Sequence, residues 1–240
     1  GANMIDKVNG LRIGADINPY LIELFKGLQK GRALIFDIPK TLYDKARTEY
    51  NNKTTNEFDL FTIAWIGYMA SANGRFFEGG YSGISKTKIG TSRNYINESI
   101  SNIQKQVSRI QNIHFVCSSY ENLDIPKNSI IYCDIPYNSN KTKGSYGLQF
   151  DHETFYKWAA DQNETVVFSD YLENVPKEFE VIWSKSKVNK LTGGGGKKST
   201  EILEKKSYQE KNYWVYDLKS KTKTGNAQRY RYYITPLEII

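Results

Sequence analysis

Short apolar runs alternate with amphipathic stretches along most of the chain. Residues 11–16 (LRIGAD) have the pattern of a short buried strand, and Asn18 and Pro19 then supply the N-cap and the first position of a helix. The apolar face of this helix is predicted to contain Leu21, Leu24, Phe25 and Leu28. The same pattern predicts further helices over residues 56–70, 93–110 and 150–162, and strands over residues 113–117, 129–133, 165–169 and 179–184.

Strands that alternate with helices are typical of an α/β domain with a largely parallel, buried sheet. The 240 residues are enough for one such domain with a small insertion. Ligands of these domains bind beyond the carboxyl ends of the strands. Four polar residues end or follow predicted strands and are expected at this edge of the sheet: Asp16, Ser119, Asp134 and Ser169.

Composition and charge narrow the classes of protein to which this chain can belong. The net charge of +7 favours a polyanionic partner. The two cysteines, Cys117 and Cys133, and the two histidines lack the spacing of a zinc site, so we predict no metal and expect both cysteines to be buried thiols. The chain has no apolar run of about 18 residues and no charged-then-apolar leader, which favours a cytoplasmic protein without a membrane partner.

The third predicted strand ends in Asp134, Ile135, Pro136 and Tyr137. A carboxylate accepts a hydrogen bond from an amino group, the following carbonyl accepts a second, and an aromatic ring stacks on a flat heterocycle. Pro136 restricts the backbone and so helps to fix the Ile135 carbonyl and the Tyr137 ring. The arrangement suits an exocyclic amine on a planar base. The alternative is an ordinary Asp-Pro turn in which Tyr137 only packs.

This tetrapeptide resembles motif IV of the amino-methyltransferases, and its context resembles the N6-adenine-specific DNA methyltransferases of the Dam-like, phage-type class. The matching segments, in the family's order, are residues 1–24, 76–83, 93–95, 115–137, 150–158, 166–171 and 198–205. The resemblance implies an α/β fold with a Rossmann-like S-adenosylmethionine-dependent methyltransferase sheet and helices on both faces, in one domain over residues 1–240. Residues 40–110 would form a small helical and loop insertion for DNA recognition.

The resemblance also implies the activity. A methyl group would pass from S-adenosylmethionine to the exocyclic amino nitrogen of an adenine flipped out of double-stranded DNA. Asp134 and the Ile135 carbonyl would hold the amine, Pro136 would complete the catalytic motif, and Tyr137 would stack on the base. A restriction enzyme is the genetic partner expected of a modification enzyme of this kind.

The cofactor contacts are implied in the same way. Asp16 would accept the ribose hydroxyls, although capping of the following helix also explains this acid. Ser119 replaces the acid that the family usually places against the cofactor's adenine, while the aromatic Tyr120 is kept. The residues assigned to the cofactor are Gly1, Ala2, Asp16, Ser119, Tyr120 and Asp134.

The sequence departs from the family in two places. Ile135 replaces a proline, which preserves the backbone carbonyl as an acceptor. The family's first strand and its Phe-x-Gly-Gly turn precede the segment that here begins at Gly1, so both are expected to be missing from this chain. Truncation is the favoured explanation, and the alternatives are a strand supplied by another polypeptide or a permuted order that uses residues 229–240.

Two other functions stay open at this point. A chain without its first strand could be a DNA-binding remnant that has lost the cofactor and the activity. A methyltransferase acting on RNA or on protein glutamine is the other alternative, although such enzymes more often carry Asn at the position of Asp134.

Residues 74–95 mix basic and aromatic side chains in the manner of a DNA-recognition loop, with an ordinary solvated loop as the alternative. Phe76 and Phe77 are expected to wedge between bases or stack on them. The residues predicted to bind DNA are Arg75, Tyr81, Lys86, Lys88 and Arg93. The lysines of residues 185–198 flank a glycine run and favour a surface hairpin over a phosphate-binding track, and residues 207–240 contain enough apolar and aromatic residues for two strands.

Overall fold

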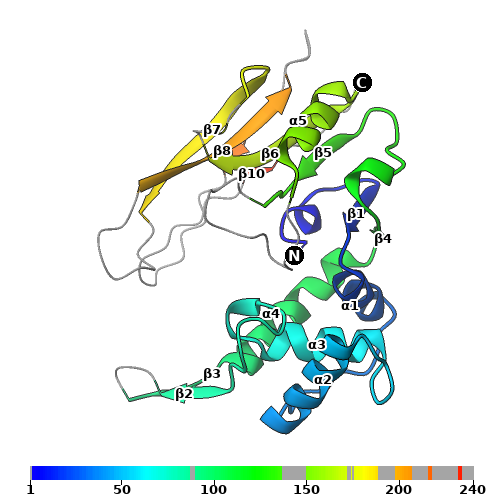
Figure 1. The fold of residues 1–240 in the computed structure, drawn as a ribbon, viewed down its shortest axis with the longest axis vertical. Coiled ribbons are helices and arrows are strands. Elements are labelled where there is room, and N and C mark those ends of the chain that lie inside the picture. The colour runs from blue at the N-terminus through cyan, green and yellow to red at the C-terminus, as the bar shows by residue number, and fades with distance from the viewer. Residues whose placement is uncertain are drawn as a thin grey trace. The chain divides into compact units, whose positions relative to one another are not determined.

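The computed structural model describes residues 2–86, 90–136, 150–171, 174, 176–188, 198–206, 216–217 and 232–233. The chain divides into two compact units, and Figure 1 labels most of their helices and strands. Unit 1 comprises Gly1–Leu123 and Val215–Thr235, and unit 2 comprises Asp124–Trp214 and Pro236–Ile240. The single domain expected over residues 1–240 stays a prediction.

Unit 1 is built mainly from helices and short strands. In chain order its elements are η1 (Ile5–Lys7), β1 (Arg12–Asp16), α1 (Pro19–Gln29), α2 (Lys40–Asn52), α3 (Leu60–Ala70), η2 (Ala72–Gly74), β2 (Ile84–Lys86), β3 (Ser92–Asn94), α4 (Tyr95–Ile110), β4 (Ile113–Cys117), η3 (Tyr120–Asn122), β9 (Tyr216–Asp217) and β10 (Tyr232–Tyr233). β9 and β10 pair antiparallel, which confirms two strands after Lys206, although each has two residues.

The predicted strand-to-helix unit at the start of the chain is confirmed. Asn18 caps α1, since its side chain accepts hydrogen bonds from the backbone N–H groups of Tyr20 and Leu21. The predicted face is buried at Leu24, Phe25 and Leu28 and half-buried at Leu21, and the structure adds Ile22 to it. Local capping and apolar spacing were therefore sufficient to locate this element.

β1 and β4 pair in parallel, from Arg12 opposite Ile113 to Asp16 opposite Cys117. α1 packs on this pair through the rings of Phe25 and Phe115, whose centroids are 4.7 Å apart. The parallel arrangement places the carboxyl ends of both strands at the same edge, as the sequence predicted.

The later helices of unit 1 begin where a polar residue caps them. α3 begins at Leu60 rather than at residue 56, because the Asp59 carboxylate accepts the Thr62 N–H and so starts the helix there. α4 begins at Tyr95 because Asn94 accepts the Asn97 N–H. Both predicted helices are therefore present, and each begins later in the sequence than predicted.

Helix α2 (Lys40–Asn52) was not predicted. Its buried face consists of Tyr43, Ala46 and Glu49, so no run of aliphatic residues marks it in the sequence. The Glu49 carboxylate accepts the backbone N–H groups of Glu57 and Phe58 and thereby fixes the connection to α3.

An aromatic cluster forms the centre of unit 1, between α1, α2 and α3. Its rings belong to Tyr20, Tyr43, Tyr50, Tyr68, Phe76 and Phe77. The cluster depends on Gly67 of α3, because a Cβ atom at this position would lie 2.4 Å from the Phe76 ring. Residues 40–110 were expected to form an insertion, and their buried side chains belong to the same core as those of α1 and β4.

Unit 2 contains a four-stranded sheet with one helix. Its elements are β5 (Ile130–Cys133), α5 (His152–Asp161), β6 (Thr165–Tyr171), β7 (Phe179–Val188) and β8 (Lys198–Lys206), and the strand order is β5-β6-β8-β7. β5 and β6 are parallel, whereas β8 pairs antiparallel with both β6 and β7. The strands β5, β6 and β7 thus run in the same direction, as the sequence predicted, whereas the polar strand β8 was not predicted and runs antiparallel to both of its neighbours.

The β7–β8 pairing confirms a hairpin around the glycine run, and the residues between the two strands lie outside the described part of the chain. α5 packs on the sheet through Phe155, which is fully buried against Phe168 of β6. The fold is thus a mixture of helices and strands consistent with an α/β domain, while a continuous Rossmann-like sheet with helices on both faces stays a prediction.

The prediction for the cysteines is wrong in part. Cys117 is the last residue of β4 and is exposed, although the alternation of the strand places it on the same face as the buried Ile113 and Phe115. Cys133 is half-buried, and both thiols are free. Within the described residues, no helix is long and apolar enough to cross a membrane.

Candidate active site

Asp16 is the last residue of β1, and one of its two carboxylate oxygens supports the helix that follows. Oδ1 accepts the Asn18 N–H over 2.7 Å and so supports the start of α1. Oδ2 makes no hydrogen bond to the described residues. Burial raises the pKa of Asp16 above its ordinary value, and the hydrogen bond from Asn18 opposes this effect. The capping role proposed as an alternative thus uses one oxygen and leaves the other available as an acceptor.

Ser119 and Tyr120 lie at the same edge of unit 1 as Asp16. The Ser118 N–H donates to the Asp16 carbonyl over 3.1 Å, directly after the last pair of the β1–β4 ladder. Ser119 caps the short helix η3, and its hydroxyl contacts both the Glu121 N–H and the Glu121 carboxylate. The prediction that Asp16 and Ser119 lie at the same strand edge is therefore confirmed within unit 1, and the Ser119 hydroxyl already interacts with Glu121.

Ala2 lies in a tight turn before η1. Its φ angle is 54°, in the left-handed region, and its carbonyl accepts the Asp6 N–H over 3.0 Å. The Asp6 carboxylate is buried and accepts hydrogen bonds from Gln106 and Arg109 of α4. This anchor was not predicted, and a lone acid between Ile5 and Lys7 gives no local sign of it. Gly1 lies outside the described residues.

Asp134 and Ile135 follow β5 directly at its carboxyl end. Cys133 stands opposite Phe168 in the parallel ladder, so the chain continues to Asp134 on β5 and to Ser169 on β6 at one edge. Ile135 is buried. Asp134 and Ser169 therefore lie level with each other on neighbouring strands, as expected, although β6 continues to Tyr171. Tyr137 lies outside the described residues.

Asp134 is exposed at the surface. Its carboxyl group nevertheless has enough protein atoms around it to lose part of its hydration. This desolvation raises the pKa of Asp134 above its ordinary value, and interaction with the Ser169 hydroxyl partly opposes it. Ser169 Oγ is buried and has no hydrogen bond of standard geometry among the described residues. The interaction is therefore a close approach rather than a well-aligned hydrogen bond, and the direction of the pKa shift follows from desolvation.

Pro136 has a partner that was not predicted. The Nε2 atom of His152, the first residue of α5, lies 2.7 Å from the Pro136 carbonyl oxygen. His152 belongs to a segment noted for its resemblance, but a histidine at a helix start gives no sequence sign of a partner sixteen residues away.

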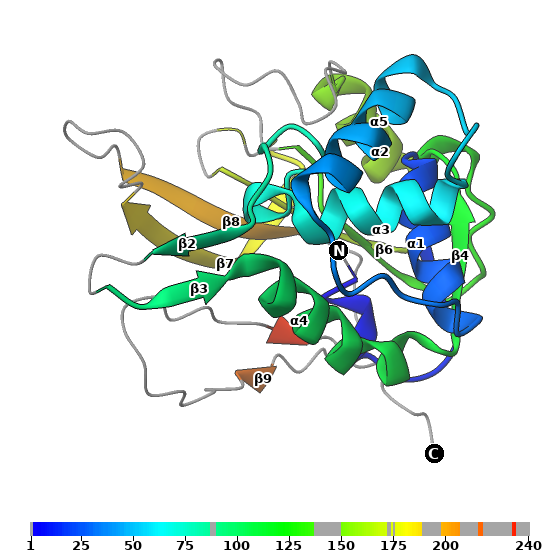
Figure 2. The ribbon, with the colours of Figure 1, turned by 90° about the horizontal axis from the view of Figure 1, so that it is seen from below.

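The β2–β3 hairpin carries the predicted DNA-binding residues Lys86 and Arg93, and Figure 2 shows it extending away from the helices of unit 1. Lys86 is exposed, and Arg93 forms a bidentate ion pair with Glu98 with both N–O distances at 2.6 Å. Arg75 is exposed in the turn after η2, and Lys88 lies outside the described residues.

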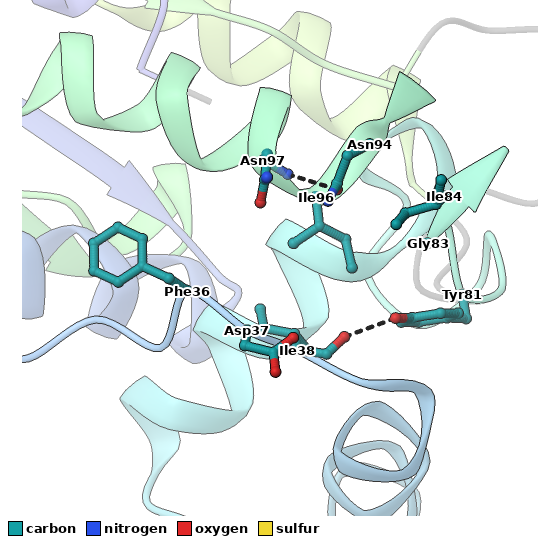
Figure 3. A pocket seen from close by; sticks show the side chains of 9 residues that line it. All are labelled: Phe36, Asp37, Ile38, Tyr81, Gly83, Ile84, Asn94, Ile96 and Asn97. Carbon is teal, nitrogen blue, oxygen red and sulfur yellow. Dashed lines mark hydrogen bonds between the residues drawn. The ribbon is translucent and has the colours of Figure 1, made fainter. Parts of the chain in front are cut away.

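The aromatic residues before this hairpin do not face solvent. Phe76 and Phe77 are 3% and 2% exposed and pack on Gly67, so the expectation that they wedge or stack on DNA bases is wrong. The Tyr81 hydroxyl donates to the Ile38 carbonyl over 2.7 Å, as Figure 3 shows. Tyr81 thus holds the base of the hairpin to the residues before α2.

A small pocket of ≈ 90 Å³ lies at the same place, between residues 36–38, 81–84 and 94–97 (Figure 3). Small-molecule sites usually measure about 300–1,000 Å³, and neither Asp16 nor Asp134 lines this pocket. It is therefore separate from the candidate active-site residues. Among the described residues, no three His, Cys, Asp or Glu side chains are grouped so that they could hold a metal ion.

Comparison with known protein families places Asp134 and Ile135 within one long match that extends over both units. The model of the D12 class N6 adenine-specific DNA methyltransferases matches residues 9–206. The chain belongs to this family. No curated protein matches the chain in sequence.

Membership in the D12 family confirms the resemblance to N6-adenine-specific DNA methyltransferases and supports DNA as the substrate. It implies S-adenosylmethionine as the methyl donor of the class. The finer assignment to a Dam-like, phage-type class stays a prediction. The D12 match includes Asp16, Ser119, Tyr120 and the Asp134–Tyr137 motif, and it leaves the individual roles of these residues to be tested.

Proposed function

We propose that this D12 family member transfers a methyl group from S-adenosylmethionine to the exocyclic amino nitrogen of an adenine that is flipped out of double-stranded DNA. The observation that carries the proposal is the position of Asp134 and the buried Ile135 at the carboxyl end of the parallel strand β5, where α/β proteins bind their ligands. The adenine must be flipped out of the base stack, because its amino nitrogen cannot be reached inside the duplex.

The residues of unit 1 fit one end of the cofactor. Asp16 Oδ2, which makes no hydrogen bond to the described residues, is suited to accept the two ribose hydroxyls of S-adenosylmethionine. Tyr120 offers a ring at the same strand edge for the cofactor's adenine, and the turn at Ala2 offers backbone groups. When bound, the cofactor supplies an electrophilic methyl group on a sulfonium.

Asp134 and Ile135 supply acceptors for the target amine. The Asp134 carboxylate and the Ile135 carbonyl accept the two N–H groups of the adenine, which orients the nitrogen and increases its electron density. Tyr137 stacks on the base, and Pro136 completes the motif. No covalent intermediate is required, so positioning and exclusion of water provide most of the rate enhancement.

The exposed hairpin of unit 1 is suited to bind the duplex. Residues 84–94 contain Lys86, Lys88 and Arg93 and no acid. Basic residues on a projecting hairpin bind phosphates and enter a groove. Arg93 would exchange the Glu98 carboxylate for a DNA phosphate, while Arg75 adds a second exposed charge and Tyr81 supports the hairpin base.

The edge of β1 supports one further part of the proposal. Among the described strands, β1 pairs with β4, and no described strand pairs with its other edge. A parallel strand ending in Phe-x-Gly-Gly, as the resemblance implies, would pair there and bring its glycine turn to the cofactor. We expect a protein with such a strand to bind S-adenosylmethionine more tightly than the same protein without it, and equal affinities would contradict this role of the strand.

The test is transfer of a labelled methyl group from S-adenosylmethionine to duplex DNA, RNA and protein offered together. We expect label in N6-methyladenine of DNA, and its loss in Asp134→Ala with folding intact. Asp161→Ala is the matched control, because this exposed aspartate ends α5 far from the motif in sequence. Label in RNA or protein, or full activity in Asp134→Ala, would overturn the proposal. Absence of both transfer and cofactor binding would favour an inactive DNA-binding remnant.

A further inference from the structure

The hydrogen bond between His152 and Pro136 has no part in the function proposed above. Nε2 of His152 lies 2.7 Å from the Pro136 carbonyl oxygen. Because a carbonyl oxygen only accepts, Nε2 carries the proton and donates it. The bond joins the start of α5 to the motif that follows β5, and so links two segments that are distant in the sequence.

His152 is held in place by the elements around it. Asp151 caps α5, since its carboxylate accepts both the N–H and the hydroxyl of Thr154. The Phe150 ring meets the His152 ring edge to face, with centroids 4.9 Å apart. Phe155, one turn along, is fully buried against β6. The donor at Nε2 therefore sits at the end of a capped and packed helix, which is the kind of support that a positioned group requires.

The hydrogen bond acts on the one soft dihedral that Pro136 retains. The proline ring fixes φ, but ψ remains free to rotate, and ψ sets the direction of the carbonyl. Pro136 is exposed, so packing gives it little support. A donor fixed at its carbonyl therefore fixes ψ, and with it the course of the backbone from Ile135 toward residue 137.

We propose that His152 is a positioning residue for methyl transfer. Its Nε2–H holds the Pro136 carbonyl, which keeps the Ile135 carbonyl on one side and the stacking residue on the other in the geometry that transfer needs. The inference rests on the proposed function, because it assigns His152 to the same motif. A misplacement of about 1 Å can lower a rate about a hundredfold, so one fixed dihedral is sufficient to matter.

The test compares His152→Ala with His152→Gln. A glutamine amide reaches about as far as Nε2 and donates a hydrogen bond, whereas alanine does not. We expect kcat to fall about tenfold or more in the alanine variant, with little change in the KM for S-adenosylmethionine or in DNA affinity. The glutamine variant should recover most of the loss. His114→Ala is the matched control, because the chain's other histidine is exposed on β4.

A second measurement does not depend on activity. The nitrogen NMR spectrum of the histidine rings should show His152 with its proton on Nε2 and His114 without that restriction. An unchanged kcat in His152→Ala, an equal loss in both variants, or the other tautomer at His152 would each overturn the inference. A wild-type protein that does not methylate adenine would instead overturn the proposed function, and the NMR result would still decide whether the contact exists.

Discussion

Gln106 donates a hydrogen bond from Nε2 to Asp6 Oδ2 over 2.9 Å, although a hundred residues separate the two side chains in sequence. Arg109 Nε reaches the same oxygen over 3.1 Å. The Asp6 carboxylate is almost fully buried, and its backbone N–H closes the turn at Ala2. The first residues of the chain are thus fixed to α4 by one acid, which makes a stability test possible.

Asp6→Ala should lower the free energy of unfolding by about 2 kcal/mol, because it removes two hydrogen bonds to a charged group and leaves the Gln106 amide buried. Urea unfolding monitored by circular dichroism measures the change. Asp44→Ala is the control, since its pair with Lys40 is exposed and should cost less than about 0.5 kcal/mol. Similar losses in both variants would contradict the anchoring role of Asp6.

The raised pKa of Asp134 predicts a pH dependence of methyl transfer. The chemistry requires the carboxylate, and desolvation means that this group protonates at a higher pH than an ordinary aspartate, whose pKa is about 3.9. At saturating cofactor, kcat should therefore fall on the acid side before ordinary aspartates titrate. Ser169→Ala removes an opposing interaction, so it should move this acid limb to higher pH with little change in the plateau. An unmoved limb would contradict the assignment to Asp134.

The same shift predicts how Asp134→Asn affects stability. A carboxyl whose pKa is raised on folding stabilises the native state most below its unfolded pKa, and the contribution is lost as pH rises through the folded pKa. At neutral pH the charged group opposes folding. Asp134→Asn should therefore leave the thermal midpoint unchanged or slightly raised while activity falls. A clear loss of stability at neutral pH would indicate that Asp134 has a structural role instead.

Local patterns in the sequence located most elements of the fold. Asn18 and Pro19 marked the start of α1, and the alternation of Ile113 and Phe115 marked β4. Such features act within one turn or one strand, so neighbouring residues are enough to reveal them. The edge positions of Asp16 and Asp134 followed from strand ends in the same way.

The features that sequence analysis missed depend on distant partners. The buried face of α2 consists of Tyr43, Ala46 and Glu49 and contains no large aliphatic side chain. β8 is a polar strand, and only its pairing with β6 and β7 defines it. Phe76 was expected to contact DNA because the loop around it mixes basic and aromatic residues, but it packs against Gly67 in the core. His152 and Asp6 meet their partners only in the folded chain, which no local pattern could show.

The two thiols should differ in reactivity. Burial raises the pKa of Cys133 to about 12, so very little of its thiolate exists near pH 8, whereas Cys117 is exposed. Iodoacetamide at pH 8 should therefore label the native protein at Cys117, and mass spectrometry should find Cys133 unmodified until the protein is unfolded. Cys117→Ser should abolish labelling of the native protein. Rapid native labelling of Cys133 would contradict its desolvation.

The ion pair between Arg93 and Glu98 predicts how the hairpin binds DNA. Glu98→Gln removes the carboxylate that competes with phosphate for Arg93, so duplex affinity should rise and depend more steeply on salt. Lys86→Ala removes one phosphate contact and should reduce the slope of log K against log salt concentration by about one. Fluorescence anisotropy at several salt concentrations measures both effects. Lys105→Ala, which removes the same charge from an exposed position on α4, should leave the slope nearly unchanged. Equal slopes for Lys86→Ala and Lys105→Ala would show that the DNA senses only the net charge of the protein, and the hairpin would then have no specific role in binding.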